Sequence, residues 1–171
     1  MDISVTHDYQ IDLDSILRFF SEEDLITDKY AQLSAKNVKV IAIKETEDGF
    51  SVATQRDVPA NVPAVLKSML GSFNTINQSE TWHWQDDESL ICKMTVEIVG
   101  VPAKITGSML FSEPAKKAGG DVATRNQVTV SVTSAMPLIG STLVKFISED
   151  IKQQMQSEYE FLLSSAPELA N

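Results

Sequence analysis

The C-terminal part of the sequence limits the fold more than any other segment. Residues 134–165, SAMPLIGSTLVKFISEDIKQQMQSEYEFLLSS, start with a short segment containing proline and glycine and continue as one long helical pattern. At about 100° per residue, one side of this helix is apolar. That side is formed by Leu143, Ile147, Ile151, Met155, Tyr159, Phe161 and Leu162. A helix with one apolar side must cover another layer of structure, so we expect it to lie across a sheet.

Two polar residues interrupt this apolar arc. Gln154 and Glu158 are four residues apart, so their side chains stack on one side of the helix, within the arc. Either the helix extends past the sheet there and meets water, or the pair forms a polar anchor inside a cavity. For a buried Glu158 we expect a donor such as Arg56, His7 or a tryptophan N–H. If Glu158 were buried without a partner, Glu158→Leu would stabilise the empty protein or leave its stability unchanged.

The junction before the helix is also predictable. Pro137 cannot donate a hydrogen bond to a sheet and disfavours helical conformation at Met136, so the preceding strand should end there. Gly140 would ease the chain into the helix.

The remaining patterns predict one strand, two helices, a hairpin and four further strands. Alternation over residues 2–11 indicates a strand, and Asp12 or Asp14 can cap a helix at 15–20, with Ser21 capping a second one at 21–33. Residues 38–58 form a hairpin in which Asp48-Gly49 would supply positive φ angles. After a short helix or loop at 63–71, strand-like runs follow at 75–85, 89–100, 103–113 and 121–134, the last two separated by the loop PAKKAGG.

This order predicts an α+β fold in one domain spanning residues 1–171. A curved antiparallel sheet of about seven strands would grip the long C-terminal helix. Such a grip leaves a space that side chains of both layers line.

Composition excludes several classes of partner. A net charge of −10 disfavours nucleic acid and anionic membranes, which attract clustered Lys and Arg. The first residues, MDISVTHDYQ, lack the features of a signal peptide, and no apolar run is long enough to span a membrane. Cys92 is the only cysteine, which excludes an internal disulfide and a thiol cluster for a metal. We therefore expect a cytoplasmic protein that is not embedded in a membrane.

Four segments carry a resemblance to a known superfamily. They are RDVPANVPAVLKSMLG (56–71), the first tryptophan of SETWHW (Trp82), VGVPAKITGSMLF (99–111) and MPLIGSTLVKFISEDI (136–151). In this order and spacing they resemble the START-like, helix-grip superfamily, also called SRPBCC, and within it a bacterial family with no assigned activity. The resemblance implies lipids, polyketides or other apolar ligands in the cavity, with cyclases and co-chaperones among the members. Fold alone does not decide between these functions.

The candidate ligand-binding residues come from the inward faces of the strands and the helix. Trp82 offers a flat apolar surface, and Met94, Met109 and Met155 an adaptable lining, although each could equally be core. Arg56 faces inward and could pair with Glu80 or Glu158, or form an ion pair at the rim of the sheet. The candidate set is His7, Arg56, Trp82, Met94, Met109, Gln154, Met155 and Glu158.

His7 lies on the apolar side of the first strand and His83 on the face opposite to Trp82. Neither has further ligands at metal spacing, so no metal site and no cofactor are predicted. Three functions remain open. The first is a non-catalytic carrier or sensor of a small hydrophobic molecule, with Arg56, Gln154 and Glu158 at its polar end. The second is a cyclase- or hydratase-like enzyme in which His7 or a carboxylate moves a proton, and the third is a co-chaperone-like interaction module whose partner the sequence does not identify.

Overall fold

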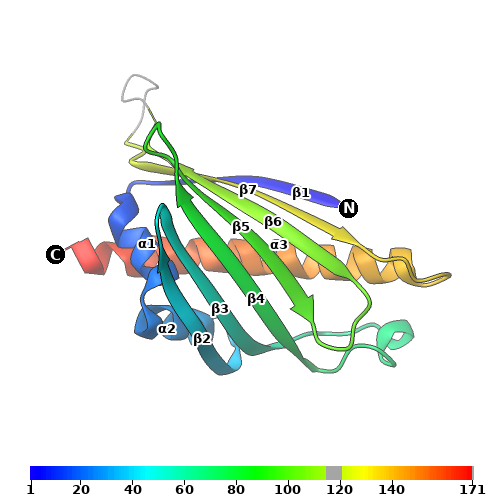
Figure 1. The fold of residues 1–171 in the computed structure, drawn as a ribbon. Helices are drawn as coiled ribbons and strands as arrows, with labels where there is room; N and C mark the ends of the chain where they lie inside the picture. Colours follow the sequence, from blue (N-terminus) through cyan, green and yellow to red (C-terminus); the bar gives the residue numbers. More distant parts are fainter. Residues whose placement is uncertain (115–120, 171) are drawn as a thin grey trace.

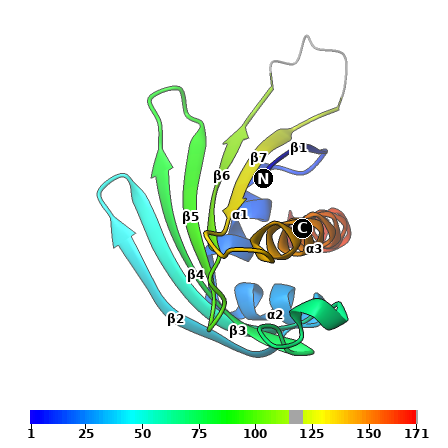
Figure 2. The same ribbon diagram turned by 90° about the vertical axis from the view of Figure 1, so that its right-hand side faces the viewer.

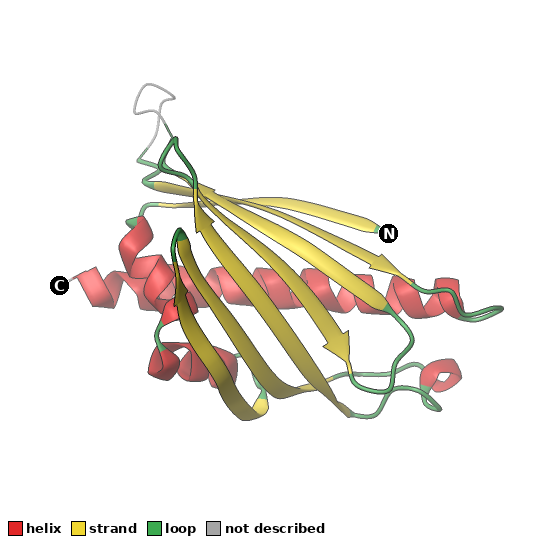
Figure 3. Cartoon of the chain, viewed as in Figure 1, coloured by secondary structure: helices red, strands yellow, loops and turns green. Residues whose placement is uncertain are grey.

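One antiparallel sheet contains all the strands that the structure describes. The computed structural model describes residues 1–114 and 121–170, so the tip of the predicted loop PAKKAGG, at 115–120, lies outside the described residues. The strands are β1 (Asp2–Tyr9), β2 (Lys36–Thr46), β3 (Gly49–Pro59), β4 (Phe73–Trp84), β5 (Leu90–Ile98), β6 (Lys104–Ser112) and β7 (Thr124–Thr133). Their order in the sheet is β1-β7-β6-β5-β4-β3-β2 (Figures 1 and 3). The seven-stranded sheet predicted from the sequence is confirmed.

The helices lie on one side of this sheet. Figure 2 shows the sheet curving around α3 (Gly140–Ser165), with α1 (Leu13–Ser21) and α2 (Glu23–Gln32) on the same concave side. The 63–71 segment contains only one short 3-10 turn, η1 (Ala64–Leu66), and a second such turn, η3 (Ala166–Ala170), follows α3. The α+β helix-grip architecture is therefore confirmed, and it places the apolar arc of α3 against the inner face of the strands.

The junction between β7 and α3 matches the prediction. β7 ends at Thr133 and α3 begins at Gly140, so the segment around Pro137 is neither strand nor helix. Leu138 in this segment has a φ of 69°, a left-handed conformation that a residue with a side chain seldom adopts. The chain thus reverses direction within a few residues and lays α3 back across the sheet.

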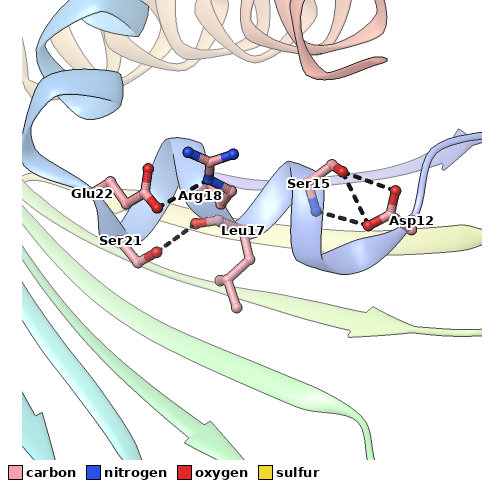
Figure 4. Close-up of polar contacts among 6 residues, drawn as sticks. All are labelled: Asp12, Ser15, Leu17, Arg18, Ser21 and Glu22. Atoms are coloured by element: carbon pink, nitrogen blue, oxygen red, sulfur yellow. Dashed lines mark hydrogen bonds and ion pairs between the residues drawn. The ribbon is translucent and has the colours of Figure 1, made fainter. Parts of the chain in front are cut away.

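The first helix begins as predicted and the second does not. Asp12 caps α1 by accepting a hydrogen bond from the backbone N–H of Ser15, at 3.0 Å (Figure 4). Ser21, predicted to cap α2, is instead the last residue of α1, and its hydroxyl donates to the carbonyl of Leu17 at 3.0 Å. A serine hydroxyl within a helix can bond four residues back, and α1 continues one residue further than its sequence pattern indicates.

The β2–β3 hairpin is present, but the reason given for its glycine is wrong. Neither Asp48 nor Gly49 has a positive φ. Gly49 is instead the first residue of β3 and pairs with His83 of β4. A Cβ at this position would collide with the carbonyl oxygen of Trp82, so glycine is required by the close approach of the next strand.

Candidate functional site

A cavity of about 180 Å³ lies between the inner face of the sheet and α3. The sheet contributes residues of β1 and of β3 to β7, and α3 contributes the arc from Phe146 to Tyr159. Seven of the eight predicted site residues line it: His7, Arg56, Met94, Met109, Gln154, Met155 and Glu158. The alternation of each strand and the helical period of α3 bring them together, because both periods place one side of an element against the cavity.

The size of the cavity limits what it holds in this conformation. An apolar protein cavity of about 150 Å³ accommodates benzene, so about 180 Å³ suits a molecule of roughly six to nine non-hydrogen atoms. Longer ligands would require side chains to move. Met94, Met109 and Met155 all line the cavity, and methionine side chains change conformation at low cost.

Most of the wall is apolar. The inner faces of β5, β6 and β7 contribute Val96, Ile105, Val128 and Val130, all of which line the cavity. Gly107 lies among them, and a Cβ there would sit 3.2 Å from Cγ of Met94 and 3.0 Å from the carbonyl oxygen of Thr129. The absence of a side chain at Gly107 therefore lets Met94 and Val130, on the two neighbouring strands, pack closely over β6.

An ion pair between a buried lysine and a partly buried glutamate connects α2 to α3 beside the cavity. The Nζ atom of Lys29 lies 3.4 Å from Oε2 of Glu158, and the two side chains are 1% and 26% exposed. The ammonium also lies over the rings of Phe20 and Tyr30, at 3.8 Å and 4.7 Å from their centroids. Burial alone would lower the pKa of Lys29, but the negative charges of Glu158 and Glu80 outweigh it and the pKa is raised. Lys29 is therefore a cation at neutral pH.

This pair corrects two expectations for Glu158. Its partner is Lys29, through an ion pair, and neither Arg56, His7 nor a tryptophan N–H forms a hydrogen bond to it among the described residues. Replacing Glu158 with leucine would therefore strand a buried ammonium, so the expected stabilisation no longer follows.

The second buried carboxylate, Glu80, is held by hydrogen bonds from its own strand. Gln78 Nε2 donates to Oε1 at 2.7 Å, and Trp82 Nε1 donates to Oε2 at 3.0 Å. Burial raises the pKa of Glu80, and the charge of Lys29 and these two donors oppose the increase. Glu80 faces the cavity, so its protonation can respond to what enters.

Arg56 does not pair with either carboxylate. Its Nη2 atom donates to Oε1 of Gln78 at 3.0 Å, and its guanidinium carbon lies 4.0 Å above the centroid of the Tyr30 ring. The Nη1 atom is out of water and has no hydrogen-bond partner in the described part of the chain. The proposed ion pair with Glu80 or Glu158 is replaced by an amide and an aromatic ring, which leaves one edge of the guanidinium free.

His7 and Asn126 form another polar area, on the neighbouring strands β1 and β7. The two residues are paired across the strands, and both are buried and line the cavity. The His7 ring stacks on Tyr159, with 4.2 Å between ring centroids and 5° between planes. Oδ1 of Asn126 has no hydrogen-bond partner among the described residues. Asn126 is not among the site residues predicted from the sequence.

The state of His7 gives a pH dependence that can be measured. Burial lowers its pKa below the ordinary value, against the attraction of Glu158, so the folded protein binds this proton less readily than the unfolded chain. The contribution of His7 to stability should therefore be complete above pH 6.5 and decrease as the pH falls below it. In urea titrations at pH 7.5 and 5.5, His7→Phe should lose less stability on acidification than wild type. His83→Phe, on the outer face, is the control; an equal loss in wild type and His7→Phe would contradict the assignment.

Trp82 is the predicted site residue that the structure places elsewhere. It is fully buried and does not line the cavity. Its ring stacks on Phe50 and Phe111, with centroid distances of 5.3 Å and 5.8 Å, and lies 5.4 Å from Phe20. Trp82 is thus a core residue whose N–H positions Glu80.

The sequence analysis missed Lys29, which lies on the helix face that Ile26 and Tyr30 bury. A lysine three residues after one buried residue and next to another was the available signal. Its partner is 129 positions away, so the pairing itself had no local signal.

Within residues 1–114 and 121–170, no group of three or more His, Cys, Asp or Glu side chains could hold a metal ion. No helix within them is long and apolar enough to cross a bilayer.

Comparison with known proteins identifies the family. The family described as "Protein of unknown function (DUF2505)" matches residues 4–164. The chain belongs to this family. Among curated proteins, no sequence match is found.

Solved structures show the fold. The protein TTHA0849 from Thermus thermophilus superposes with a TM-score of 0.66 at 14% identity, covering 100% of both chains. A START superfamily protein from Mycobacterium smegmatis superposes with a TM-score of 0.57 at 15% sequence identity, covering 98% of both chains. Human STARD10 superposes with a TM-score of 0.60 at 10% sequence identity, covering 98% of this chain and 65% of STARD10. These likenesses confirm the START-like fold predicted from the sequence.

Proposed function

We propose that this DUF2505 protein binds a small hydrophobic molecule in the cavity between the sheet and α3, as a non-catalytic carrier or sensor. The observation that carries the proposal is a cavity of about 180 Å³ with an apolar wall and a few buried polar groups converging on it. Binding sites for small molecules commonly have this composition. The START-like fold supports the proposal, since the resemblance of the sequence implies apolar ligands in this position.

The contacts of the polar residues favour binding over proton transfer. Glu158 is held by Lys29, and His7 is stacked on Tyr159, so each is fixed by a neighbour rather than aligned with the other. A general base needs a partner within hydrogen-bonding reach of the proton that it moves. The polar groups therefore serve to orient a ligand.

Native mass spectrometry of the protein purified under mild conditions, followed by extraction into organic solvent, tests the proposal. A co-purifying molecule of stoichiometric amount, released by the solvent, is the expected result. Repeated absence of any bound molecule, together with no binding of small apolar probes, would contradict the proposal and favour an interaction module.

A cavity-filling variant provides a second test. Val96 lines the cavity, so Val96→Phe should occupy part of it and weaken the binding of benzene or a similar probe at least tenfold. Stability should change little, because the added ring fills existing space. Val99→Phe is the matched control, since Val99 is 50% exposed. Titrations of the probe followed by NMR measure its dissociation constant for each variant. Equal binding by Val96→Phe and Val99→Phe would show that the probe binds outside this cavity.

A further inference from the structure

The guanidinium of Arg56, at the polar end of the cavity, has two fixed contacts and one nitrogen without a partner among the described residues. Gln78 accepts from Nη2 of Arg56, and the ring of Tyr30 covers one guanidinium face. Tyr30 is itself 6% exposed and packs with Ile26 and Val52 in a second small core, so the support is rigid. Nη1 remains buried and without a partner in the part of the chain that the structure describes, although Arg56 lines the cavity.

A free guanidinium edge specifies the group that it can bind. Arginine nitrogens only donate hydrogen bonds, and the group stays protonated in proteins. A buried donor without a partner is unfavourable, so a ligand atom that accepts from Nη1 gains the full benefit of satisfying it. Oxygen acceptors are therefore selected over an apolar group of the same shape.

The charge of the surroundings decides between a neutral and an anionic acceptor. Three carboxyl groups line the cavity, Glu80, Asp150 and Glu158, and burial raises the pKa of Glu80 and of Asp150. Against these three groups stand two cations, Lys29 and Arg56, of which only Lys29 forms an ion pair, with Glu158. A carboxylate ligand would add another negative charge to a poorly solvated site, whereas a carbonyl or hydroxyl oxygen would not.

We propose that the ligand of this cavity is an uncharged molecule whose apolar body carries an oxygen acceptor, and that this oxygen accepts a hydrogen bond from Nη1 of Arg56. The inference rests on the proposed binding function and specifies its ligand class. It also assigns the apolar body to the wall of β5 to β7 and the oxygen to the β3 side.

Three probes of equal size and similar shape test it. Acetophenone carries a neutral carbonyl, cumene replaces the carbonyl oxygen with a methyl group, and benzoate carries a carboxylate; each has about nine non-hydrogen atoms, the upper limit for the cavity. Dissociation constants are measured by NMR titration for wild type, Arg56→Met and Arg18→Met. Arg18, on α1, is 45% exposed and serves as the matched control.

The expected result is selective. Arg56→Met should weaken acetophenone binding roughly tenfold and leave cumene binding within about twofold, because only the ketone uses the guanidinium. Arg18→Met should change neither, and benzoate should bind wild type more weakly than acetophenone. The infrared C=O stretch of bound acetophenone should shift to lower frequency in wild type and not in Arg56→Met. Should Arg56→Met fail to fold, the infrared comparison still tests the contact, because the C=O stretch of acetophenone bound to wild type would stay at its unshifted frequency if no N–H donated to the oxygen.

Different failures have different meanings. If Arg56→Met leaves acetophenone binding unchanged, Arg56 does not bind the oxygen and the inference is wrong. If benzoate binds more tightly than acetophenone, the ligand class is anionic and the inference is also wrong, while the binding function stands. If none of the three probes binds wild type, the binding function itself fails and the inference falls with it.

Discussion

Replacing Trp82 with alanine is expected to lower the free energy of unfolding by about 3–5 kcal/mol, the largest effect that we predict for a single substitution. Trp82 is fully buried, and three phenylalanine rings pack against it. The truncation would leave a cavity and also remove the donor to Oε2 of Glu80, which would then be buried with one hydrogen bond fewer. Urea denaturation measures the change.

Two further variants separate the contributions of Trp82. Trp82→Phe keeps an aromatic ring in the cluster but removes the N–H, so it should cost less than alanine while still destabilising the protein. Trp84→Ala is the control, because Trp84 is 43% exposed, and its cost should be about 1 kcal/mol or less. Comparable losses for Trp82→Ala and Trp84→Ala would show that the aromatic cluster is not the centre of the core.

The second large effect concerns the ion pair between α2 and α3. Glu158→Leu should destabilise the protein by roughly 3 kcal/mol, because removing one partner of a buried pair leaves the other charge uncompensated. Lys29 is 1% exposed and cannot reach water without moving the helix. Adding Lys29→Met should recover most of the loss, since the double variant replaces both charges with apolar groups. Urea midpoints of the four proteins form the double-mutant cycle.

The pH dependence of the same variants provides an independent check. In wild type the pKa of Lys29 is raised, so its contribution to stability is present at neutral pH and is lost as the pH rises through the folded pKa. In Glu158→Leu, burial should dominate and lower that pKa, so stability should increase between pH 8 and 10. Between pH 8 and 10 the Lys29 contribution should therefore be nearly constant in wild type and should increase with pH in Glu158→Leu. The same dependence of stability on pH in both proteins, or a Glu158→Leu variant as stable as wild type, would contradict the ion pair. It would indicate that Glu158 lies at a solvated end of the helix.

Local periodicity was sufficient to predict the fold and seven of the residues that line the cavity. The alternation of strand residues identified the inward faces that carry Arg56, Met94 and Met109, and the helical period identified Gln154, Met155 and Glu158. The break at Pro137 was predictable for the same reason, since the missing N–H and fixed φ act within the residue itself. These properties depend on neighbours in the sequence, which are available without a structure.

Other features depended on contacts between distant segments. Lys29 and Glu158 meet because α2 and α3 pack against the same concave face, and no pattern within either helix specifies that contact. Trp82 and Met94 lie on inward faces of neighbouring strands, yet Trp82 is enclosed by rings from α1, β3 and β6 while Met94 faces the cavity. Gly49 is needed because β4 passes close to it. The sequence by itself determined which side of each helix and strand is apolar. The tertiary structure decided which polar groups pair and where a cavity remains. The reason is that pairing and packing depend on side chains that the fold brings together from distant positions in the chain.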